Sequence, residues 1–327
     1  MPDKIIAAYQ IVTPMFLGDA EQGLAPVNSM SFKGLMRFWW RALNWRRVDG
    51  NSSEEQLKDL HRAEAQLFGT ANHQHYPDNG QSLFILQVKH HCRQTCSGKN
   101  YPAPYKSQSA YLGFGLFKMG EHKDRDAWDK HKHAFTVSLI LSPHISTEQS
   151  AQLLEVLQAI GLWGSLGSRS RNGFGSIALA SLTQNSQSLD VDIKDSMDYD
   201  NKIEALLNLH RQQRGLPPYT ALSRDVKFTT SKKYYPDAIS AHNAIGQAYY
   251  NLRGKDGTVS RPERVVFGLP LAKQDTENRR ASPLFIHIHP VGKQFVILLL
   301  YIPAKFHTDN RYGTINDSPV IELLGKI

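Results

Sequence analysis

The sequence holds only two cysteines, Cys92 and Cys96, among its 327 residues. Two thiols are too few for a disulfide framework, so we expect a fold that is stable in a reducing compartment. Long apolar runs are also missing, because the longest, Phe295–Ile302, is far too short to cross a bilayer. The N-terminus lacks the charged and then apolar pattern of a signal peptide. The sequence therefore predicts a soluble, cytoplasmic protein with no membrane partner.

Acidic residues are in short supply. Thirty Asp and Glu stand against 38 Lys and Arg, which gives a net charge of +8 and an isoelectric point near 9.3. From Gln22 to Val48 there is no acidic residue. Such a balance favours a nucleic acid or another polyanion as partner. Hydrophobic residues make up 41 % of the chain, and its length suffices for two domains of ordinary size.

Several catalytic motifs are absent from the sequence. There is no GxxxxGK[ST], HExxH or GxSxG motif and no DxD cluster, which argues against a P-loop, a zinc peptidase, an α/β-hydrolase and two-metal chemistry. His90, His91, Cys92 and Cys96 lie close together, but no second pair completes a zinc-binding set. We expect no metal and no cofactor. Two further histidine pairs are expected to be solvated or structural: His131 with His133, and His287 with His289.

A basic, tryptophan-rich helix is predicted over Ser31–Arg47. On a wheel of about 100° per residue, Lys33, Arg37 and Arg41 share one face, and Trp40 lies at its edge beside Lys33. The opposite arc is apolar: Leu35, Met36, Phe38, Trp39, Ala42 and Leu43. We predict that the three cations contact phosphates and that Trp40 stacks on a base. The alternative, which stays open, is a core helix whose arginines are solvated.

A second candidate site is the stretch Gly161–Gly175, and we call its part from Gly164 to Gly175 the glycine-rich loop. Glycines let a backbone turn tightly and bring its N–H groups close to an anion. The candidate phosphate contacts, to RNA or another polyanion, are Ser168, Arg169, Ser170 and Arg171, between the glycines Gly164, Gly167, Gly173 and Gly175. The alternative is a flexible surface turn. A third basic pair, Arg279 and Arg280, is a candidate RNA contact or a charged loop.

The order of predicted elements indicates an α+β fold. Strand, helix, strand, strand, helix, strand is the ferredoxin-like pattern, shared by the RRM domains that bind RNA. The expected elements of the first half are Lys4–Leu17, the basic helix, Glu54–Phe68, Ser82–His90, Phe135–Leu141, Ser146–Trp163 and Phe174–Leu182. Those of the second half are Lys202–Arg211, Asp225–Tyr235, Ala238–Leu252, Val265–Leu269, Leu284–His289 and Phe295–Tyr301. We predict two ferredoxin-like domains packed side by side, residues 1–185 with an insertion around 98–132, and residues 186–327.

Several stretches together resemble a known family. They are IVTP at 11–14 with Gly18 and Asp19, FKGLMRFWWRA at 32–42, GSLGSRSRNGFG at 164–175, FGLP at 267–270 and RRASP at 279–283. The sequence is similar to the RAMP superfamily of CRISPR proteins, and the tryptophan helix resembles the head-capping subunits of type III-B (Cmr) effector complexes.

The resemblance implies a non-catalytic RNA-binding subunit near the 3′ end of the crRNA. There it would help to capture target RNA for antiviral defence, with crRNA, target RNA and other RAMP-type Cmr subunits as partners. A metal-independent RAMP endoribonuclease that processes CRISPR RNA is the main alternative, because a histidine near an attacked 2′-OH could act as base. A protein scaffold that touches no RNA is the third hypothesis.

Overall fold

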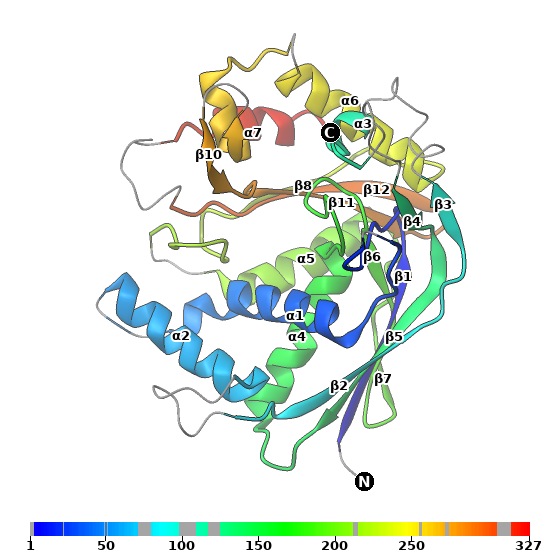
Figure 1. Cartoon of the computed structure of the whole chain (residues 1–327), viewed down its shortest axis with the longest axis vertical. Helices are drawn as coiled ribbons and strands as arrows, with labels where there is room; N and C mark the ends of the chain where they lie inside the picture. The colour runs from blue at the N-terminus through cyan, green and yellow to red at the C-terminus, as the bar shows by residue number, and fades with distance from the viewer. Residues whose placement is uncertain are drawn as a thin grey trace.

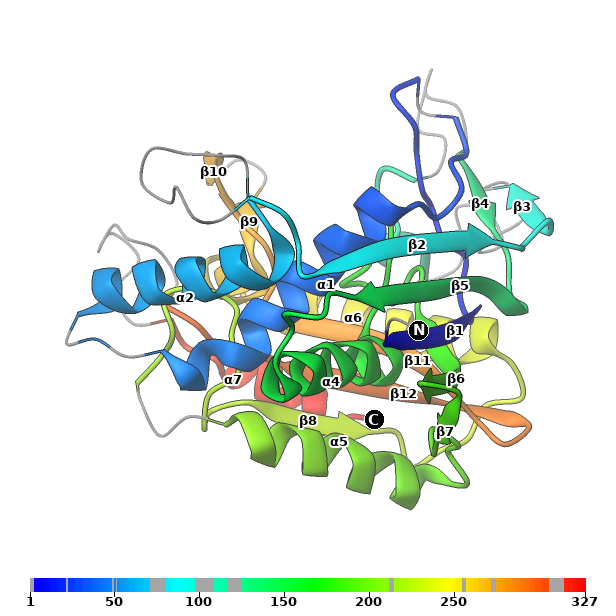
Figure 2. The ribbon, with the colours of Figure 1, turned by 90° about the horizontal axis from the view of Figure 1, so that it is seen from below.

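The computed structural model describes residues 3–21, 23–48, 50, 52–70, 80–97, 109–116, 125–211, 215–254, 257–271, 275–305 and 315–327. The N-terminal half is built on a five-stranded antiparallel sheet with the order β2-β5-β1-β6-β7 (Figure 2). Its strands are β1 (Lys4–Ile11), β2 (Phe84–His90), β5 (His131–Leu141), β6 (Ile177–Gln184) and β7 (Gln187–Leu189). The first four strands have the ferredoxin-like order, so the predicted topology of this half is confirmed.

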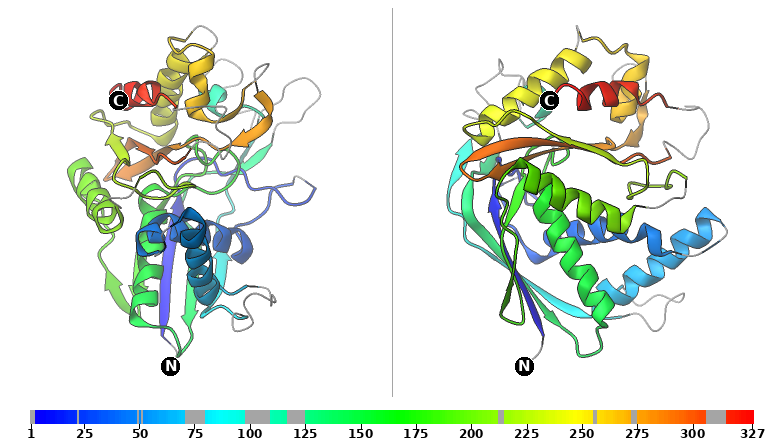
Figure 3. Two further views of the ribbon diagram at one scale, coloured as in Figure 1. Left: turned by 90° about the vertical axis from the view of Figure 1, so that its left-hand side faces the viewer. Right: turned by 180° about the vertical axis from the view of Figure 1, so that it is seen from behind.

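Three helices cover one face of this sheet (Figure 3). They are α1 (Ser29–Asn44), α2 (Ser53–Phe68) and α4 (Thr147–Trp163). Each begins at a capping box, in which the side chain before the helix and the residue at its third position bond each other's backbone N–H. The alternation of buried and half-buried residues along β1 turns Ile5, Ala7 and Tyr9 toward the helices.

The face of the sheet away from these helices is poor in aromatic side chains. The five strands contain three aromatic residues, Tyr9, Phe84 and Phe135, and all three are at most 3 % exposed. RRM domains stack bases on aromatic residues of an open sheet face. The described strands of this sheet share that topology but offer no exposed ring on which a base could stack.

The C-terminal half contains a three-stranded sheet with the order β11-β12-β8. It lies between α6 on one face and α4 and α5 on the other (Figure 1). Its elements are α5 (Ser196–His210), β8 (Lys227–Thr230), α6 (Ala238–Arg253), β11 (Leu284–Val291), β12 (Gln294–Tyr301) and α7 (Ser318–Leu324). These strands follow the ferredoxin-like order of strands one to three, and no fourth strand pairs with β8 among the described residues.

Shorter elements complete the chain. They are η1 (Trp45–Arg47), β3 (Thr95–Ser97), α3 (Ser109–Leu112), β4 (Asp126–Trp128), η2 (Pro262–Phe267), β9 (Leu269–Leu271) and β10 (Asp275–Arg280). The predicted strand over residues 265–269 is wrong, because most of that segment belongs to the 3-10 helix η2, which starts at a proline. Of the predicted insertion, residues 98–108 and 117–124 lie outside the described chain. None of the described helices is long and apolar enough to span a membrane.

The predicted boundary after residue 185 stays a prediction. Strand β7 begins two residues later and pairs with β6 of the first sheet. Helix α5 then packs on α4 and contributes Leu206 and Leu207 to the core that the two halves share.

Candidate nucleic-acid interface

The basic face of α1 is organised by one buried carboxylate. Glu64 of α2 is 2 % exposed, and its Oε1 lies 2.7 Å from Nε of Arg37 and 2.7 Å from Nη1 of Arg41. The two arginine side chains remain 32 % and 38 % exposed. Charge-assisted bonds of this length fix both guanidinium groups while one carboxylate offsets only one of the two charges. The face therefore presents ordered cations with a net positive charge.

Lys33 continues this face toward the sheet. Its Nζ lies 5.6 Å from the ring centroid of Phe84, which is a cation–π contact. Partial burial lowers the pKa of Lys33 from its ordinary value, and the charge of Arg37 adds to this effect. The three cations predicted from the wheel thus lie along one side of α1.

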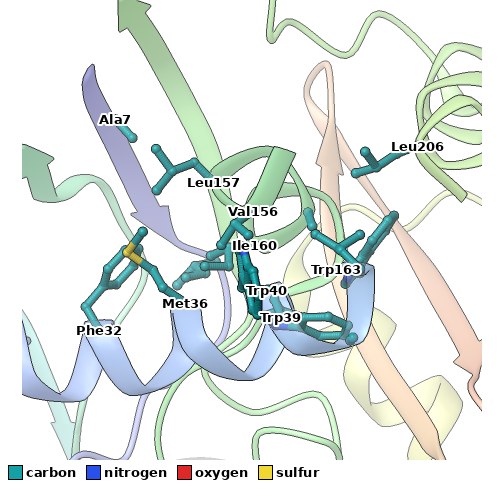
Figure 4. Close-up of a cluster of buried hydrophobic side chains, with 14 of the residues drawn as sticks. Ala7, Phe32, Met36, Trp39, Trp40, Val156, Leu157, Ile160, Trp163 and Leu206 are labelled. Atoms are coloured by element: carbon teal, nitrogen blue, oxygen red, sulfur yellow. The ribbon is translucent and has the colours of Figure 1, made fainter. Parts of the chain in front are cut away.

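Trp40 is not at the exposed edge, and its predicted placement is wrong. It is 2 % exposed, and its Nε1–H donates to Oε1 of Gln152 at 2.9 Å. Its ring packs edge-on against Phe68 at 5.9 Å. Figure 4 shows Trp40 and Trp39 pointing from α1 toward α4. Because α2 and α4 cover this border of the helix, Trp40 cannot stack on a base in this structure, whereas the expected core position of Trp39 is confirmed.

Phe38 is the aromatic residue on the uncovered border of α1. It is half-buried, and its ring contacts Trp39 at 5.1 Å and Phe285 at 6.2 Å. The helical wheel places Phe38 in the apolar arc. A wheel has two borders, and only the positions of α2 and α4 decide which border stays open. In the sequence, the only indication that Phe38 borders the basic face is that it directly follows Arg37.

Gly34 lies on the exposed face of α1, in its interior. A Cβ atom built there would meet nothing within 4 Å. Glycine inside a helix costs about 1 kcal/mol relative to alanine, and no close packing or positive φ requires it here. Arg37, Phe38 and Arg41 follow at i+3, i+4 and i+7 and share its side of the helix. A bare patch of backbone is thus flanked by two arginines and a ring.

The glycine-rich loop is a fixed joint between the two halves. The N–H of Ser168 donates to Phe16 O at 2.9 Å, and the N–H of Gly175 donates to Pro14 O at 2.8 Å. On the other side, the N–H of Ile286 on β11 donates to Arg171 O at 2.9 Å. The flexible turn considered above is therefore excluded by these backbone bonds.

The glycines of this loop are required by packing. Gly167 and Gly175 have φ values of +99° and +62°, which disfavour other residues. A Cβ on Gly175 would lie 1.9 Å from Leu166 O, and one on Gly164 would lie 2.5 Å from Ile160 O. Gly173, with φ of +82°, packs closely against His242. These residues hold the loop in place, and no RNA contact has to be assumed to explain them.

The polar residues of the loop differ in accessibility. Arg169 is exposed, and its Nε donates to Phe114 O at 2.8 Å. The hydroxyl of Ser168 accepts a bond from Nη1 of Arg125 at 3.1 Å. Ser170 is half-buried and faces α1 across a pocket.

Arg171 is largely enclosed by aromatic rings. Its guanidinium carbon lies 4.5 Å from the Phe285 centroid and 5.5 Å from that of Phe38, and its Nη1 donates to Ser282 O. Burial lowers the pKa of Arg171 to about 10, with the charge of Arg280 contributing. Arg171 thus stays protonated at neutral pH.

The third basic pair adjoins this site. Arg279 and Arg280 end β10, where Arg279 is exposed and Nη2 of Arg280 donates to Ala304 O at 3.3 Å. The charge of Arg280 helps to lower the pKa of Arg171, so the third basic pair lies close to the glycine-rich loop. The structure therefore brings Ser170 and Arg171 close to α1, whereas Ser168 and Arg169 contact the segment around Phe114 and Arg125.

Two pockets flank Phe38 and together form a groove along α1. The wider pocket, of roughly 530 Å3, is lined by Arg41, Glu64, His61 and Tyr219 among others. The smaller one, of roughly 190 Å3, lies between α1, the glycine-rich loop and β11. The groove thus runs from α2 to the C-terminal sheet, with Arg41 of α1 and Arg171 of the glycine-rich loop along it.

The described residues contain neither a cluster of metal ligands nor a reactive thiol. No three His, Cys, Asp or Glu side chains gather there as ligands for a metal ion. Cys92 and Cys96 are free thiols. Burial raises the pKa of Cys96 to about 12, so it is protonated and unreactive at neutral pH.

Comparisons with known proteins agree with this architecture. The CRISPR system Cmr subunit Cmr1-1 of Pyrococcus furiosus is 25 % identical over 321 residues, covering 90 % of this chain and 86 % of that protein. The crystal structure of Cmr1 from Pyrococcus furiosus in its apo form has a TM-score of 0.64 at 21 % identity and covers 96 % of this chain and 92 % of that one.

A chain of the type III-B Cmr-beta complex bound to cognate target RNA, solved by cryo-EM, has a similar fold. Its TM-score is 0.59 at 12 % identity, covering 99 % of this chain and 98 % of that one. The sequence profile of the RAMP superfamily matches residues 9–178. Because this match spans just over half of the 327 residues, the chain belongs to the RAMP superfamily.

Proposed function

We propose that this chain is a non-catalytic, RNA-binding subunit of a type III-B CRISPR effector complex. It lies near the 3′ end of the crRNA and helps to capture target RNA for antiviral defence in the cytoplasm. Its partners are crRNA, target RNA and the other RAMP-type Cmr subunits. The proposal is supported by a relative named as a Cmr subunit and by a fold shared with a chain of a complex that holds target RNA.

The observation that carries the proposal is the exposed face of α1. Gly34 leaves room for another backbone to approach, while Arg37 and Arg41 flank it with fixed guanidinium groups. Phosphates of a single strand bind such ordered cations, and a base next to them can stack on an aromatic ring. Phe38, and not Trp40, offers that ring.

The remaining contacts in the proposal come from the other two basic segments. Lys33, Arg37 and Arg41 form what we call the phosphate track, with Lys33 at its end near β2. Arg169 and Arg279 are the exposed cations of the other two segments. Ser168, Ser170, Arg171 and Arg280 belong to the same two segments and would supply hydrogen bonds or local positive charge.

The test removes the arginines without leaving an unpaired buried charge. Replacing Arg37 and Arg41 alone would leave Glu64 buried without a cation, which costs about 3–5 kcal/mol of stability. We therefore use the triple variant Arg37→Gln, Arg41→Gln and Glu64→Gln, with Glu64→Gln as its matched control. Affinity for single-stranded RNA is measured at several salt concentrations.

Each phosphate contact contributes about 0.7 to the slope of log affinity against log salt. The triple variant should thus lose about 1.4 from this slope, while the control keeps the wild-type value. A triple variant that keeps both the slope and the affinity of the wild type would rule out α1 as the RNA-binding element.

One observation favours a second candidate function, the metal-independent endoribonuclease. His61 lines the wider pocket beside Arg41, so a potential general base and a cation share one site. The pure chain is incubated with labelled CRISPR RNA in EDTA, and our proposal expects no cleavage. Steady cleavage that His61→Ala abolishes would establish the nuclease instead.

A further inference from the structure

The smaller pocket beside Phe38 has three aromatic walls. It is lined by Phe38 and Trp39 from α1 and by Phe285 from β11. The rings of Trp39 and Phe285 lie 5.4 Å apart, and Phe38 packs edge-on against Trp39. With a volume of roughly 190 Å3, it is smaller than the pockets of about 300–1,000 Å3 that hold drug-sized ligands. Its size and walls suit one small, flat ring system.

The remaining wall of this pocket is polar. It consists of Arg171 and the hydroxyl-bearing residues Ser165 and Ser170 of the glycine-rich loop. Neither hydroxyl makes a hydrogen bond to another part of the described chain. A hydroxyl both donates and accepts, so it can bond the edge of any base. The guanidinium of Arg171, stacked on Phe285, adds a fixed positive charge next to the ring walls.

The pocket opens beside the phosphate track of α1, because Phe38 lines this pocket as well as the wider one. A strand held by Arg37 and Arg41 could turn one nucleotide inward without losing its backbone contacts. Unstacked bases of single-stranded RNA are bound between aromatic side chains and arginine planes.

We infer that this pocket is a subsite for one unstacked nucleobase of the bound RNA, an inference that rests on the proposed function. The base stacks on Phe38 and hydrogen-bonds to Ser165 and Ser170. The groups that line the pocket accept any of the four bases, so the subsite adds affinity for single strands and little sequence preference.

The experiment compares two probes with the same backbone charge. One is an oligouridine RNA, and the other is an oligomer of equal length that carries tetrahydrofuran spacers in place of all bases. Stacking of a base is worth about 1–3 kcal/mol, which corresponds to roughly a fivefold to hundredfold difference in affinity. The full-length wild-type chain should prefer oligouridine by this factor.

Phe38→Leu removes the ring and keeps an apolar side chain, and it should abolish most of the preference for oligouridine. The matched control is Phe228→Leu, which changes a half-buried ring on β8 outside this pocket. It should keep the wild-type preference. If Phe38→Leu lowers the melting temperature, the pair Ser165→Ala and Ser170→Ala is measured as well and should also reduce the preference.

The outcomes separate this subsite from the proposed function. A wild-type chain that binds both oligomers equally tightly still binds a backbone but has no base subsite, which overturns the inference alone. A wild-type chain that binds neither oligomer overturns the proposed function together with the inference. A preference that survives in both the Phe38→Leu and the double serine variants assigns the base to another place and also overturns it.

Discussion

Glycine serves two opposite purposes in this chain. Gly175 has a φ of +62°, and a Cβ there would collide with Leu166 O at 1.9 Å, so the folded chain itself requires a glycine. Gly34 is helical and faces open space, so the folded chain would be more stable with alanine. Nothing in the described chain requires a glycine at position 34, whereas the close approach of a partner would.

We therefore predict that Gly34→Ala changes stability and RNA affinity in opposite directions. The substitution should raise the free energy of unfolding by about 1 kcal/mol, because it removes the conformational entropy of a helical glycine. It should weaken RNA binding, because the added methyl group stands where the backbone of the RNA approaches. Urea unfolding and RNA titration of the same preparation measure both effects.

Asn201→Ala on the exposed surface of α5 serves as the control for Gly34→Ala. It also raises helix propensity, but it should leave RNA affinity unchanged. If Gly34→Ala is more stable and binds RNA as tightly as the wild type, the close approach of a backbone to α1 is refuted.

At the scale of the element, α1 shows what a helical pattern can and cannot tell. The period predicted a helix over Ser31–Arg47, which the structure shows as α1, and the common face of Lys33, Arg37 and Arg41 is confirmed. The pattern could not tell that Glu64 pairs with two of these cations, because α2 reaches them only through the tertiary fold. For the same reason the pattern assigned the exposed border to Trp40 and a core position to Phe38. The two residues lie on opposite borders of the basic face, and in the structure Trp40 is the buried one.

Trp40→Phe should therefore reduce stability and spare RNA binding. The variant loses the indole N–H and leaves Oε1 of the buried Gln152 without its donor, which costs about 1–3 kcal/mol. Thermal or urea unfolding should detect this loss, and RNA affinity should equal that of the wild type. Adding Gln152→Leu removes the Oε1 atom that has lost its donor, so the double variant should recover part of the lost stability. If Trp40→Phe keeps the wild-type stability but binds RNA more weakly, then Trp40 contacts the RNA.

At the scale of the whole molecule, the order of elements along the sequence predicted the α+β class and the ferredoxin-like order of the first sheet. It could not predict how the halves meet. That junction depends on the glycine-rich loop, whose glycines suggested an anion site but whose backbone bonds Phe16, Pro14 and Ile286. A loop rich in Gly, Ser and Arg looks the same in sequence whether its N–H groups face a ligand or the two sheets it joins.

The junction also contains a titratable group. His242 of α6 is fully buried, its Nε2–H donates to Asn172 O of the glycine-rich loop at 2.8 Å, and its ring packs edge-on against Phe174 at 4.4 Å. Burial lowers the pKa of His242 from its ordinary 6.5 to about 4. The imidazole that bonds the two halves together is therefore neutral.

The stability of the whole chain should fall on mild acidification through this group. Since the folded pKa lies below the unfolded value, the contribution of His242 is complete above pH 6.5 and is lost as the pH falls toward 4. In this window the free energy of unfolding should decrease by about 1.4 kcal/mol per pH unit from His242 alone.

His242→Gln keeps an N–H donor for Asn172 O but cannot take up a proton. It should be less stable than the wild type at pH 7 and lose less stability down to pH 5, as measured by urea unfolding at each pH. Carboxylates that titrate in this range are common to both proteins and cancel in the difference. Parallel pH dependences of the two proteins would mean that His242 is not the group whose protonation loosens the junction.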